Sequence, residues 1–462
     1  MLDTDVAAAC RPSKNPRPPQ CRMQEIAMSE IRYASYEDAI SLVRDVDTFA
    51  VPLGPGIPSE FLHQLGTRDS FTELEVFGAL LIDLYPLFTK PGVRLRSGFF
   101  GPAERILRDT GARVEFAPAD FRRFRPILER LNPRVMATAA APPDDDGWMS
   151  LSLHAGATVG TLHDCGADPE RVLIVEVNDA LPHTFGFGEH RHAIHVDEAD
   201  IIVRSERAPF ELAEIEPTEV DRTIAAYAAS FIQPGATLQT GIGGIPSTVA
   251  SLLAEREGGG YGIHSEMFTT GLMKLHKAGK VSNAGKGGAF DGYSVTTFAA
   301  GTAELYEWLD QNNEVAFLPV DLVNAPELIA ANNHMVTING ALIVDLAGQV
   351  VADSIRGKQF SGVGGHEDFL SGPGLEVEDR SLLCLPSTHR HDGAVASRIV
   401  GQLPQGSIVS TPRHQIDVVI TEFGAVELEG RTVRERARLI ASIAAPEFRD
   451  ELLAQAEIWP EG

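Results

Sequence analysis

The stretch TLQTGIGGIPSTVASLLAER, residues 237–256, indicates the fold class of this protein most directly. Its first residues, Thr237–Thr240, are typical of a short strand. The glycine-rich run Gly241–Pro246 predicts a tight turn, and Ser247–Arg256 carries apolar residues at helical spacing. Pro246 suits the first turn of that helix, because a proline there costs no hydrogen bond. A strand that passes through a tight turn into a helix is the building unit of α/β proteins.

The rest of the chain repeats this alternation of strands and helices. Helical periodicity is found in Thr248–Glu257 and Thr302–Gln311. Strands separated by helices favour parallel pairing, so the sequence predicts an α/β protein with largely parallel sheets. Further apolar runs of strand length are Val172–Val177, Ile201–Val203, Val315–Pro319, Leu382–Pro386 and Asp417–Thr421.

A short internal repeat predicts two halves of similar design. Residues 54–65 read GPGIPSEFLHQL and residues 242–253 read IGGIPSTVASLL. Both contain GIPS followed by apolar residues at helical spacing, with Pro58 and Pro246 in the first helical turn. Coincidence is the alternative, but each copy lies early in its half, and 462 residues exceed one ordinary domain. We therefore expect two similar open α/β domains, 35–220 and 221–462, that meet in the polar stretch Pro217–Ile224.

The first 34 residues differ in composition from this α/β body. They have no apolar core of the kind that a secretory signal needs. Arginines there would suit a transit peptide, whereas Asp3, Asp5 and the prolines argue against one. We expect residues 1–34 to be a disordered tail. Its prolines are Pro12, Pro16, Pro18 and Pro19.

The formal net charge of −25 limits the classes of partner, because a field of that sign repels nucleic acid. No run of about 18 apolar residues is present, so we expect no membrane span. The four cysteines form no C-x-x-C pair, and such sparse use is typical of a reducing cytoplasm. We expect Cys384 to be buried, and Cys165 to be either buried or in an exposed loop. Cys10 and Cys21 lie in the tail.

Two glycine clusters could receive a negatively charged ligand through backbone N–H groups. The turn Gly241–Pro246 precedes a helix, whose N-terminus favours negative charge. It is not a dinucleotide fingerprint, because the third glycine is missing. The second cluster, Gly357–Asp368, has four glycines within nine residues, which suits a backbone nest for an oxyanion. A tight structural turn and a surface loop are the alternative interpretations.

Glu266 lies in the run GIHSEMF, residues 262–268. We read residues 262–267 as the end of a strand, followed by a helix with Thr269 or Thr270 as N-cap. This puts Glu266 at the carboxyl end of a strand, where ligands bind in open α/β sheets. Apolar neighbours would partly desolvate the carboxylate and raise its pKa, although a nucleophile must be ionised. A solvated loop glutamate is the alternative.

Other kinds of chemistry have little support. His190, His192 and His195 with Glu189 could ligate zinc, but their spacing matches no closed zinc site, and Arg191 would add a positive charge. We therefore expect no metal. The chain has neither the G-x-S-x-G of serine hydrolases nor the G-x-x-x-x-G-K-[ST] phosphate loop.

The motifs occur in an order that resembles the acetyl-CoA hydrolase/transferase family, especially its 4-hydroxybutyrate and butyrate CoA-transferase branch. The resemblance is strong over the C-terminal half and looser over the N-terminal half. It implies two α/β domains of the class I CoA-transferase type. The ordered motifs are GIGGIP (241–246), GIHSEMF (262–268), INGALIVDLAGQV (338–350), SGVGGHEDF (361–369), LPST and SRIV (385–400), VVITEFGAVEL (418–428) and RTVRERARLIASIAAPEFR (431–449).

The resemblance implies roles for particular residues. The glutamate of the family's H-[ST]-E-M motif is the nucleophile, which puts that role on Glu266. The glycine turn and the later glycine loop are expected to line the CoA site, and Leu342 to contact CoA through its backbone. The CoA-site residues implied in this way are Gly241, Ile242, Gly243, Gly244, Ile245, Leu342, Gly364 and Gly365.

This chain departs from the family pattern near the site. Thr269–Gly271 stand where Ser-Asp-Gly is usual, so one carboxylate is lost. Ile343 stands where many relatives have Glu or Gln, and His366 and Glu367 replace the more usual Gln and Val. These changes keep the nucleophile but leave the acyl specificity open.

The resemblance implies a CoA-transferase that moves CoA between a short-chain acyl-CoA and a carboxylate through a glutamyl-CoA thioester, in a ping-pong reaction. It implies CoA as a co-substrate, no tightly bound cofactor and a homodimer. The alternatives are an acyl-CoA hydrolase that uses the same glutamate, a non-catalytic acyl-CoA-binding protein and a nicotinamide dehydrogenase. The last would need an intact G-x-G-x-x-G after a strand, which the chain does not have there.

Overall fold

The structure is a computed structural model that describes residues 32–374, 376–391 and 393–458. The described residues from Tyr33 onward form one compact unit, so the division at residue 220 stays a prediction. The tail expected over residues 1–34 lies almost wholly outside the described residues, as do Cys10 and Cys21. Cys165 and Cys384 are both buried.

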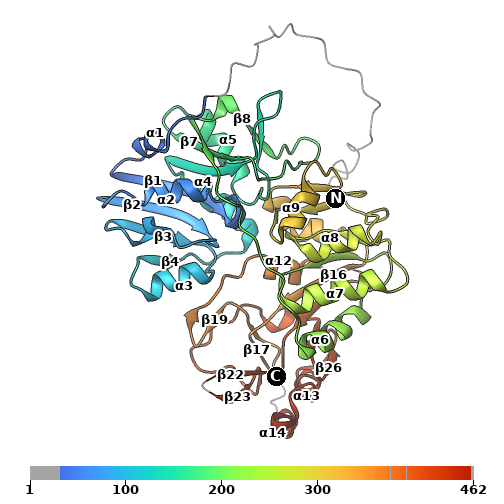
Figure 1. Cartoon of the computed structure of the whole chain (residues 1–462). Coiled ribbons are helices and arrows are strands. Elements are labelled where there is room, and N and C mark those ends of the chain that lie inside the picture. Colours follow the sequence, from blue (N-terminus) through green and yellow to red (C-terminus); the bar gives the residue numbers. More distant parts are fainter. Residues whose placement is uncertain (1–31, 375, 392, 459–462) are drawn as a thin grey trace, which may run out of the picture. The chain divides into compact units, whose positions relative to one another are not determined.

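Two large sheets organise the chain (Figure 1). The first has the order β4 (Val114–Phe116), β3 (Val93–Ser97), β2 (Glu73–Ala79), β1 (Val46–Leu53), β5 (Val135–Ala140), β7 (Val172–Asn178) and β9 (Ile201–Ser205). The second has the order β11 (Gly262–Ile263), β10 (Thr237–Thr240), β16 (Met335–Gly340), β21 (Arg380–Cys384), β25 (Val418–Thr421) and β26 (Gly424–Glu427).

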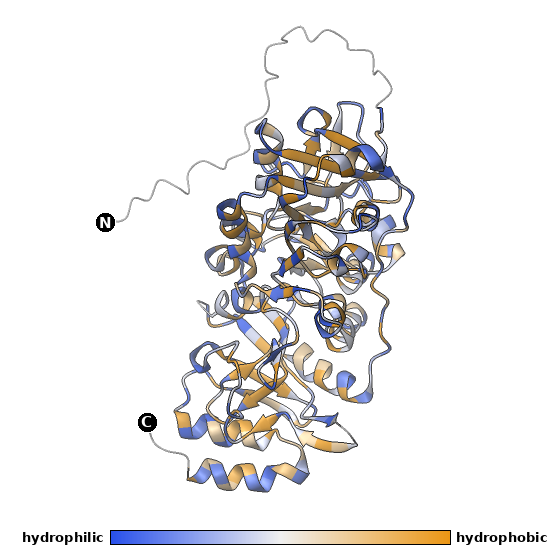
Figure 2. Ribbon diagram, turned by 90° about the vertical axis from the view of Figure 1, so that its left-hand side faces the viewer, coloured by the Kyte–Doolittle hydropathy of each residue, from blue (hydrophilic) through white to orange (hydrophobic). Residues whose placement is uncertain are grey.

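Neighbouring strands in both sheets are parallel, except that β26 pairs antiparallel with β25. The prediction of two α/β parts with largely parallel sheets is confirmed. Both faces of such a sheet are covered, which explains the continuous apolar runs seen in the sequence. The strands are mostly apolar in Figure 2, whereas the helices carry polar and apolar residues in alternation.

Helices accompany the strands in both parts of the chain. α6 begins in the polar stretch at Pro217–Ile224, where Thr218 is its N-cap. The helices before residue 217 are α1 (Tyr36–Ser41), α2 (Ser59–Leu65), α3 (Pro102–Asp109), α4 (Phe124–Leu131) and α5 (Val159–Ala167). Those after it are α6 (Glu219–Ser230), α7 (Gly244–Glu255), α8 (Thr270–Lys277), α9 (Ala303–Leu309), α10 (Val320–Val323), α11 (Pro326–Ile329), α12 (His366–Ser371), α13 (Val433–Ser442) and α14 (Pro446–Glu457).

Small two- and three-stranded sheets complete the fold. Their strands are β6 (Trp148–Ser150) with β8 (Ala193–His195), β12 (Met267–Phe268) with β14 (Phe298–Ala299), β13 (Ser294–Thr296) with β15 (Val315–Phe317), β17 (Ile343–Asp345) with β18 (Val350–Val351) and β24 (Ile399–Val400), β19 (Ser354–Ile355) with β20 (Lys358–Gln359), and β22 (Thr388–His391) with β23 (Ala394–Ser397). None of the described helices is long and apolar enough to cross a bilayer.

The predicted strand–turn–helix units are present with adjusted bounds. The strand expected at Thr237–Thr240 is β10. α7 begins three residues before the predicted Ser247, so Pro246 lies in its first turn, as expected. The expectation for Pro58 is wrong: it is the N-cap residue of α2, because Gly54–Gly56 form a separate 3₁₀ turn before that helix.

The two copies of the GIPS repeat follow corresponding strands. β1 and β10 are each the first strand of their sheet in the chain, and each has later strands on both sides. The chain therefore continues from β1 and from β10 first toward one edge of the sheet and later toward the other. The place where the strand order reverses is called a topological switch point, and ligands bind there, beyond the carboxyl ends of the strands.

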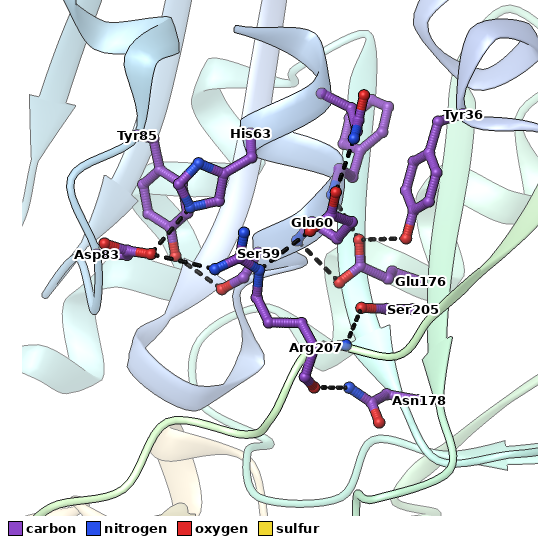
Figure 3. A network of polar contacts seen from close by, with 12 residues as sticks. Tyr36, Ser59, Glu60, His63, Asp83, Tyr85, Glu176, Asn178, Ser205 and Arg207 are labelled. Atoms are coloured by element: carbon purple, nitrogen blue, oxygen red, sulfur yellow. Dashed lines mark hydrogen bonds and ion pairs between the residues drawn. The ribbon is translucent and has the colours of Figure 1, made fainter.

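The turn in the first half is closed by a carboxylate of the protein itself. The backbone N–H groups of Glu60 and Phe61 donate to the buried Glu176 carboxylate, at 3.2 and 2.6 Å. Figure 3 shows Glu176 between Glu60 and Tyr36. The Tyr36 hydroxyl also donates a hydrogen bond to the Glu176 carboxylate. Burial raises the pKa of Glu176 to about 7. The first turn of α2 therefore has a carboxyl group of the protein against its backbone N–H groups, whereas the corresponding turn of the second half faces a cavity.

Candidate active site

A cavity of about 300 Å³ lies at the carboxyl ends of strands from both large sheets. Leu53 ends β1, Ala79 ends β2, Thr240 ends β10 and Gly340 ends β16. β10 and β16 lie on either side of the switch point of the second sheet, and β1 and β2 are neighbouring strands of the first sheet, so the cavity lies at carboxyl strand ends where ligands bind in α/β sheets. Its other lining residues are Leu80, Phe99, Phe121, Phe124, Gln239, Gly241, Ile242, Glu266, Met267, Phe298, Asn339, Ala352, Gly362, Val363, Gly364, Gly365, His366 and Phe369.

Glu266 lies in this cavity on a bent connection rather than on one continuous strand. The strand predicted over residues 262–267 is divided into β11 and β12, with His264–Glu266 between them. The Glu266 carbonyl accepts hydrogen bonds from the N–H groups of Thr297 and Phe298, at 3.0 and 3.2 Å, and from the Thr296 hydroxyl. Three donors on one carbonyl hold the backbone of Glu266 in place.

The two residues before Glu266 hold the bend. His264 is buried, and its ring nitrogens contact the Val323 carbonyl at 2.7 Å and the Asn332 side chain at 3.1 Å. Burial and the nearby Lys286 lower the pKa of His264 to about 3, so its ring is neutral. The Ser265 hydroxyl contacts the carbonyl oxygens of Thr240 and Met267. The H-S-E motif therefore consists of one carboxylate in the cavity and two residues that position it.

A chain of polar side chains holds the Glu266 carboxylate. Asn324, buried at the end of α10, donates from Nδ2 to Glu266 Oε2 at 2.6 Å and to Asp368 Oδ2 at 3.0 Å. Asp368 is buried in α12 and forms an ion pair with Arg122. Asn324 therefore has its amide fixed between two carboxylates, and Arg122 balances the charge of one of them.

The protonation of Glu266 reflects its surroundings. Its carboxylate is half-buried in an apolar cavity, and desolvation raises its pKa to about 8. The Asn324 hydrogen bond opposes this shift, and the negative charge of Asp368 adds to it. The expected rise in pKa is confirmed. A carboxylate that binds its proton so tightly is also more basic, and hence more nucleophilic once it is ionised.

The later glycine loop packs directly on Glu266. A Cβ atom at Gly365 would lie 1.9 Å from Glu266 Oε2, so this position has no room for any side chain. Gly364 has a φ of +57°, and a Cβ there would lie 3.8 Å from Glu266 Oε1. The Gly364 carbonyl accepts from the Phe121 N–H at 2.9 Å, which joins this loop to the first half of the chain.

The structure brings only some of the predicted CoA-site residues to the cavity. Gly241, Ile242, Gly364 and Gly365 line it together with Glu266, and the Ile242 side chain is 55% exposed. Gly243, Gly244 and Ile245 continue into α7 away from the lining. Gly243 has a φ of +114°, which the turn requires.

Leu342 lies outside the cavity lining, and its backbone already has partners. Its N–H donates to the Val351 carbonyl at 2.9 Å, and its carbonyl accepts from Arg398 at 3.1 Å. Its contact with CoA stays a prediction.

The residues that depart from the family pattern have defined places in the structure. Thr269 is the N-cap of α8 and accepts from the Leu272 N–H, so the predicted cap is confirmed. His366 lines the cavity and contacts the Thr411 hydroxyl, which in turn bonds to Glu367. Burial lowers the pKa of His366 to about 4, so this side chain brings no positive charge to the cavity. Ile343 is half-buried in β17.

The His190–His195 segment has no metal-like arrangement. The ring of His192 is buried with Nε2 on the Ser152 carbonyl, and His195 is the N-cap of a 3₁₀ turn. Throughout the described ranges, no group of three or more His, Cys, Asp or Glu side chains is positioned to hold a metal ion.

No sequence motif marks Asn324 or Asp368 as a site residue. Asn324 is 58 residues from Glu266 and shares no motif with it. The sequence offers one indication of Asn324: it comes shortly after the strand predicted at Val315–Pro319. Residues that follow a strand in this way lie at its carboxyl end, where ligands bind. Asp368 ends the glycine cluster that begins at Gly357, and its own position carried no further signal.

Comparison with known proteins agrees with this geometry. Residues 301–456 match the family model of the acetyl-CoA hydrolase/transferase C-terminal domain. The 4-hydroxybutyrate coenzyme A transferase of Clostridium kluyveri is 34% identical over 424 residues, which cover 90% of this chain and 95% of that protein. The succinyl-CoA:cyclohexane-1-carboxylate CoA transferase of Geobacter metallireducens is 32% identical, with coverage of 91% and 93%.

A solved structure supports the same relationship. The crystal structure of RipA from Yersinia pestis is 30% identical, with a TM-score of 0.83, and the alignment covers 92% of this chain and 97% of that one. The chain therefore belongs to the acetyl-CoA hydrolase/transferase family of enzymes and lies there among CoA-transferases, as the order of its motifs predicted.

Proposed function

We propose that this enzyme moves CoA between an acyl-CoA and a carboxylate acceptor, with Glu266 as the covalent nucleophile. The observation that carries the proposal is a half-buried carboxylate, held by Asn324, in an apolar cavity bordered by two glycine segments. This arrangement supplies a positioned nucleophile, hydrogen-bond donors and restricted water, which acyl transfer needs.

The reaction consists of two exchanges in which atoms balance. A Glu266 oxygen attacks the thioester carbonyl, the C–S bond breaks, and an acyl-glutamyl anhydride and CoA thiolate form. The thiolate then attacks the glutamyl carbonyl, which releases the free acid and leaves a glutamyl-CoA thioester. An acceptor carboxylate repeats these steps in reverse and departs as the new acyl-CoA, which restores Glu266. No tightly bound cofactor is needed, because one thioester replaces another.

The two oxygens of Glu266 have different surroundings. Oε2 accepts from Asn324 Nδ2, whereas Oε1 accepts no hydrogen bond from the described residues. We therefore assign the attack to Oε1. When the thiolate later adds to the glutamyl carbonyl, negative charge develops on the remaining oxygen, and Asn324 Nδ2 is already 2.6 Å from it. Such a donor contributes roughly 3–4 kcal/mol to the transition state.

Backbone N–H groups at the cavity edge are further donors. In the described residues, the N–H groups of Ile242 and Gly365 donate to no acceptor of the protein. Both residues line the cavity, and both belong to the glycine segments assigned to the CoA site. We assign them to the thioester oxygen, and we assign the glycine turn Gly241–Ile245 to the CoA moiety.

The proton on Glu266 controls the first step. With a pKa of about 8, the free enzyme at neutral pH has Glu266 mainly protonated. The ionised fraction at pH 7 is then about one tenth, which costs about 1.4 kcal/mol in the barrier. The rate should therefore rise with pH up to about 8.

A trapping experiment tests the proposal. The enzyme is incubated with butyryl-CoA and treated with borohydride, which reduces a glutamyl thioester to an alcohol, or with hydroxylamine, which gives a hydroxamate. Peptide mass spectrometry should find the change on Glu266, and only when acyl-CoA is present. The control is Glu266→Gln, which keeps the shape of the side chain. A change on another residue, or full activity in Glu266→Gln, would contradict the proposal.

The same experiment separates transfer from hydrolysis. Both use the Glu266 adduct, and they differ in whether a carboxylate or water attacks it. A transferase should release little free CoA with or without an acceptor, and should form the CoA thioester of acetate or another acceptor once that acceptor is added. Steady release of free CoA without an acceptor would identify a hydrolase. No adduct and no turnover would identify a non-catalytic acyl-CoA-binding protein. The homodimer stays a prediction.

A further inference from the structure

Only one end of the Asn324 side-chain amide has partners in the structure. Its Nδ2 group donates to Glu266 Oε2 at 2.6 Å and to Asp368 Oδ2 at 3.0 Å. Asn324 is fully buried, and its Oδ1 accepts no hydrogen bond from the described residues. A buried acceptor without a partner is costly, so the surroundings must favour this orientation of the amide for another reason.

The reversed orientation of the amide would place Asn324 Oδ1 between the two carboxyl groups. Oδ1 has no proton to donate, so it can face a carboxyl oxygen only if that oxygen carries a proton. Ionised carboxylates therefore exclude the reversed orientation, whereas neutral carboxyl groups favour it because they supply the missing donor. The charge on the two carboxyl groups thus decides which end of the Asn324 amide faces Glu266.

Glu266 itself cannot fix this orientation in the free enzyme. Burial raises its pKa to about 8, so the group is mainly neutral at neutral pH. The pKa of Asp368 is about 6, raised by burial and lowered by Asn324 and Arg122, so Asp368 is mainly ionised there. The Asp368 carboxylate therefore keeps Nδ2 in place. Because Glu266 Oε2 then stays an acceptor, the proton of neutral Glu266 is on Oε1, the oxygen to which we assign the attack.

An arginine from the first half of the chain is the partner of Asp368. Arg122 lies in the 3₁₀ turn η4 (Phe121–Arg123) and forms an ion pair with Asp368, whose side chain is fully buried. The Arg122 backbone N–H also donates to Asp368 Oδ2 at 3.5 Å. The same turn is fixed to the glycine loop, since the Phe121 N–H donates to the Gly364 carbonyl. The Arg122 guanidinium is therefore held against Asp368.

The other ionisable groups around Asp368 are acidic. Asp120 lies 3.3 Å from Arg122, and after burial its charge is a further cause that raises the pKa of Asp368. Glu266 and Glu367 have pKa values raised by burial and by nearby acidic groups, Asp368 among them. Within the described part of the chain, Arg122 is the one cation that forms an ion pair with Asp368. A buried carboxylate that loses its partner cation takes up a proton, so the charge of Asp368 depends on Arg122.

We propose that Arg122 and Asp368 are positioning residues that keep Nδ2 of Asn324 directed at Glu266. Arg122 preserves the negative charge of Asp368, and that charge excludes the reversed amide. The inference rests on the proposed reaction at Glu266 and adds how its hydrogen-bond donor is oriented. Full activity therefore needs two ionised carboxylates, although only Glu266 reacts.

The acid limb of the pH profile reports on both carboxylates, because kcat/KM follows the ionisations of the free enzyme. The assay is CoA transfer from butyryl-CoA to acetate. In the wild type, log(kcat/KM) should rise with a slope of one between about pH 6 and pH 8, where Glu266 alone titrates. Below about pH 6 the slope should approach two, because Asp368 must lose its proton as well.

Arg122→Gln removes the charge and keeps a polar side chain. The pKa of Asp368 should rise, so the steep part of the limb should begin well above pH 6, and kcat/KM at pH 7 should fall by about tenfold or more. Most of this loss should disappear near about pH 9, where Asp368 is ionised again. Arg122→Lys restores the charge and should return the limb toward that of the wild type.

Arg125→Gln is the matched control. Arg125 follows the same turn and forms an ion pair with Asp321 in α10 at 2.5 Å, and the described contacts of Asp321 do not include Asn324. This variant breaks a comparable ion pair between the two halves, so it should leave the shape of the acid limb unchanged even if the protein melts at a lower temperature.

Asp368→Asn is the second test variant. It has no ionisation at this position, so its acid limb should keep a slope of one with no steep part. Its plateau should lie below that of the wild type, because an asparagine can face Asn324 with either end of its amide and no longer selects one orientation.

The outcomes separate this inference from the reaction at Glu266. Borohydride trapping of the wild type near pH 8 reports on Glu266 alone, and the absence of an adduct there would mean that the reaction itself fails. If the adduct forms but Arg122→Gln keeps the wild-type limb, or loses activity by the same factor at every pH, Arg122 only joins the two halves and the inference is overturned. If Arg122→Gln does not fold, Asp368→Asn decides, and a steep limb in that variant overturns the inference as well.

Discussion

Replacing Gly365 by alanine should disable the nucleophile without damaging the fold. The Gly365 backbone has φ −92° and ψ 9°, which alanine adopts readily, so backbone strain plays no part. The new methyl group would lie 1.9 Å from Glu266 Oε2 and 2.5 Å from Asn324 Nδ2. An ordinary carbon–oxygen contact is about 3.4 Å, so Oε2 has to retreat by about 1.5 Å.

That retreat has a calculable consequence. It breaks the 2.6 Å hydrogen bond between Asn324 and Glu266, and a hydrogen bond to a charged group contributes about 1.5–3 kcal/mol. A misplacement of about 1 Å at a reacting group lowers the rate by roughly a hundredfold. We expect kcat to fall by about 10²–10³-fold, and the KM for acyl-CoA to change much less, because the CoA moiety is held elsewhere.

The assay follows CoA transfer from butyryl-CoA to acetate, together with the rate at which Glu266 is trapped by borohydride. Gly160→Ala is the matched control: Gly160 lies within α5, and a Cβ there would make only an ordinary 3.5 Å contact with Arg125. It should keep wild-type activity. If Gly365→Ala retained kcat within about threefold of the wild type and formed the adduct at the normal rate, the assigned position of the carboxylate would be wrong.

Three further predictions concern the charge around Glu266. Asn324→Ala removes the donor to Glu266 Oε2, so kcat should fall by about a hundredfold and the apparent pKa in the pH profile of kcat/KM should rise. An unchanged profile would contradict the role of Asn324 as a donor to Glu266. Asp368→Asn removes a negative charge that raises the pKa of Glu266, so the same profile should move to lower pH, opposite to Asn324→Ala; a shift to higher pH would contradict this. The third prediction concerns the free energy of unfolding. The pKa of Glu266 in the folded protein, about 8, lies above its ordinary value of 4.5. The contribution of Glu266 to stability is therefore full below about pH 4.5 and is lost as the pH rises toward 8. Glu266→Gln has no such loss, so in thermal melts its stability should match that of the wild type near pH 4.5. Near pH 8 it should exceed the wild type by on the order of 2 kcal/mol, after allowance for partial exposure. If the variant and the wild type were equally stable at both pH values, the raised pKa would be ruled out.

Local sequence patterns determined the fold class, and they singled out Glu266 as the proposed nucleophile. Apolar runs such as Val172–Val177 are buried strands because a parallel sheet covered on both faces excludes polar side chains. Thr269 is a helix cap because a threonine before an apolar helical pattern satisfies a free backbone N–H. These are short-range effects, so neighbouring residues suffice to predict them. Glu266 was predicted from the order of the motifs, which is also contained in the sequence.

Only the tertiary structure decided what surrounds Glu266. Asn324 follows α10 and Asp368 lies in α12, and the chain of contacts from Asp368 through Asn324 to Glu266 depends on how β15, α10 and α12 pack at the carboxyl ends of the strands. The closeness of Gly365 to Glu266 Oε2 arises in the same way. The difference between the two GIPS turns also needed the structure, because Glu176 reaches the first turn from a strand 115 residues away. Contacts between segments so distant in the chain leave no periodic or local signal, since packing brings them together only after each element has formed.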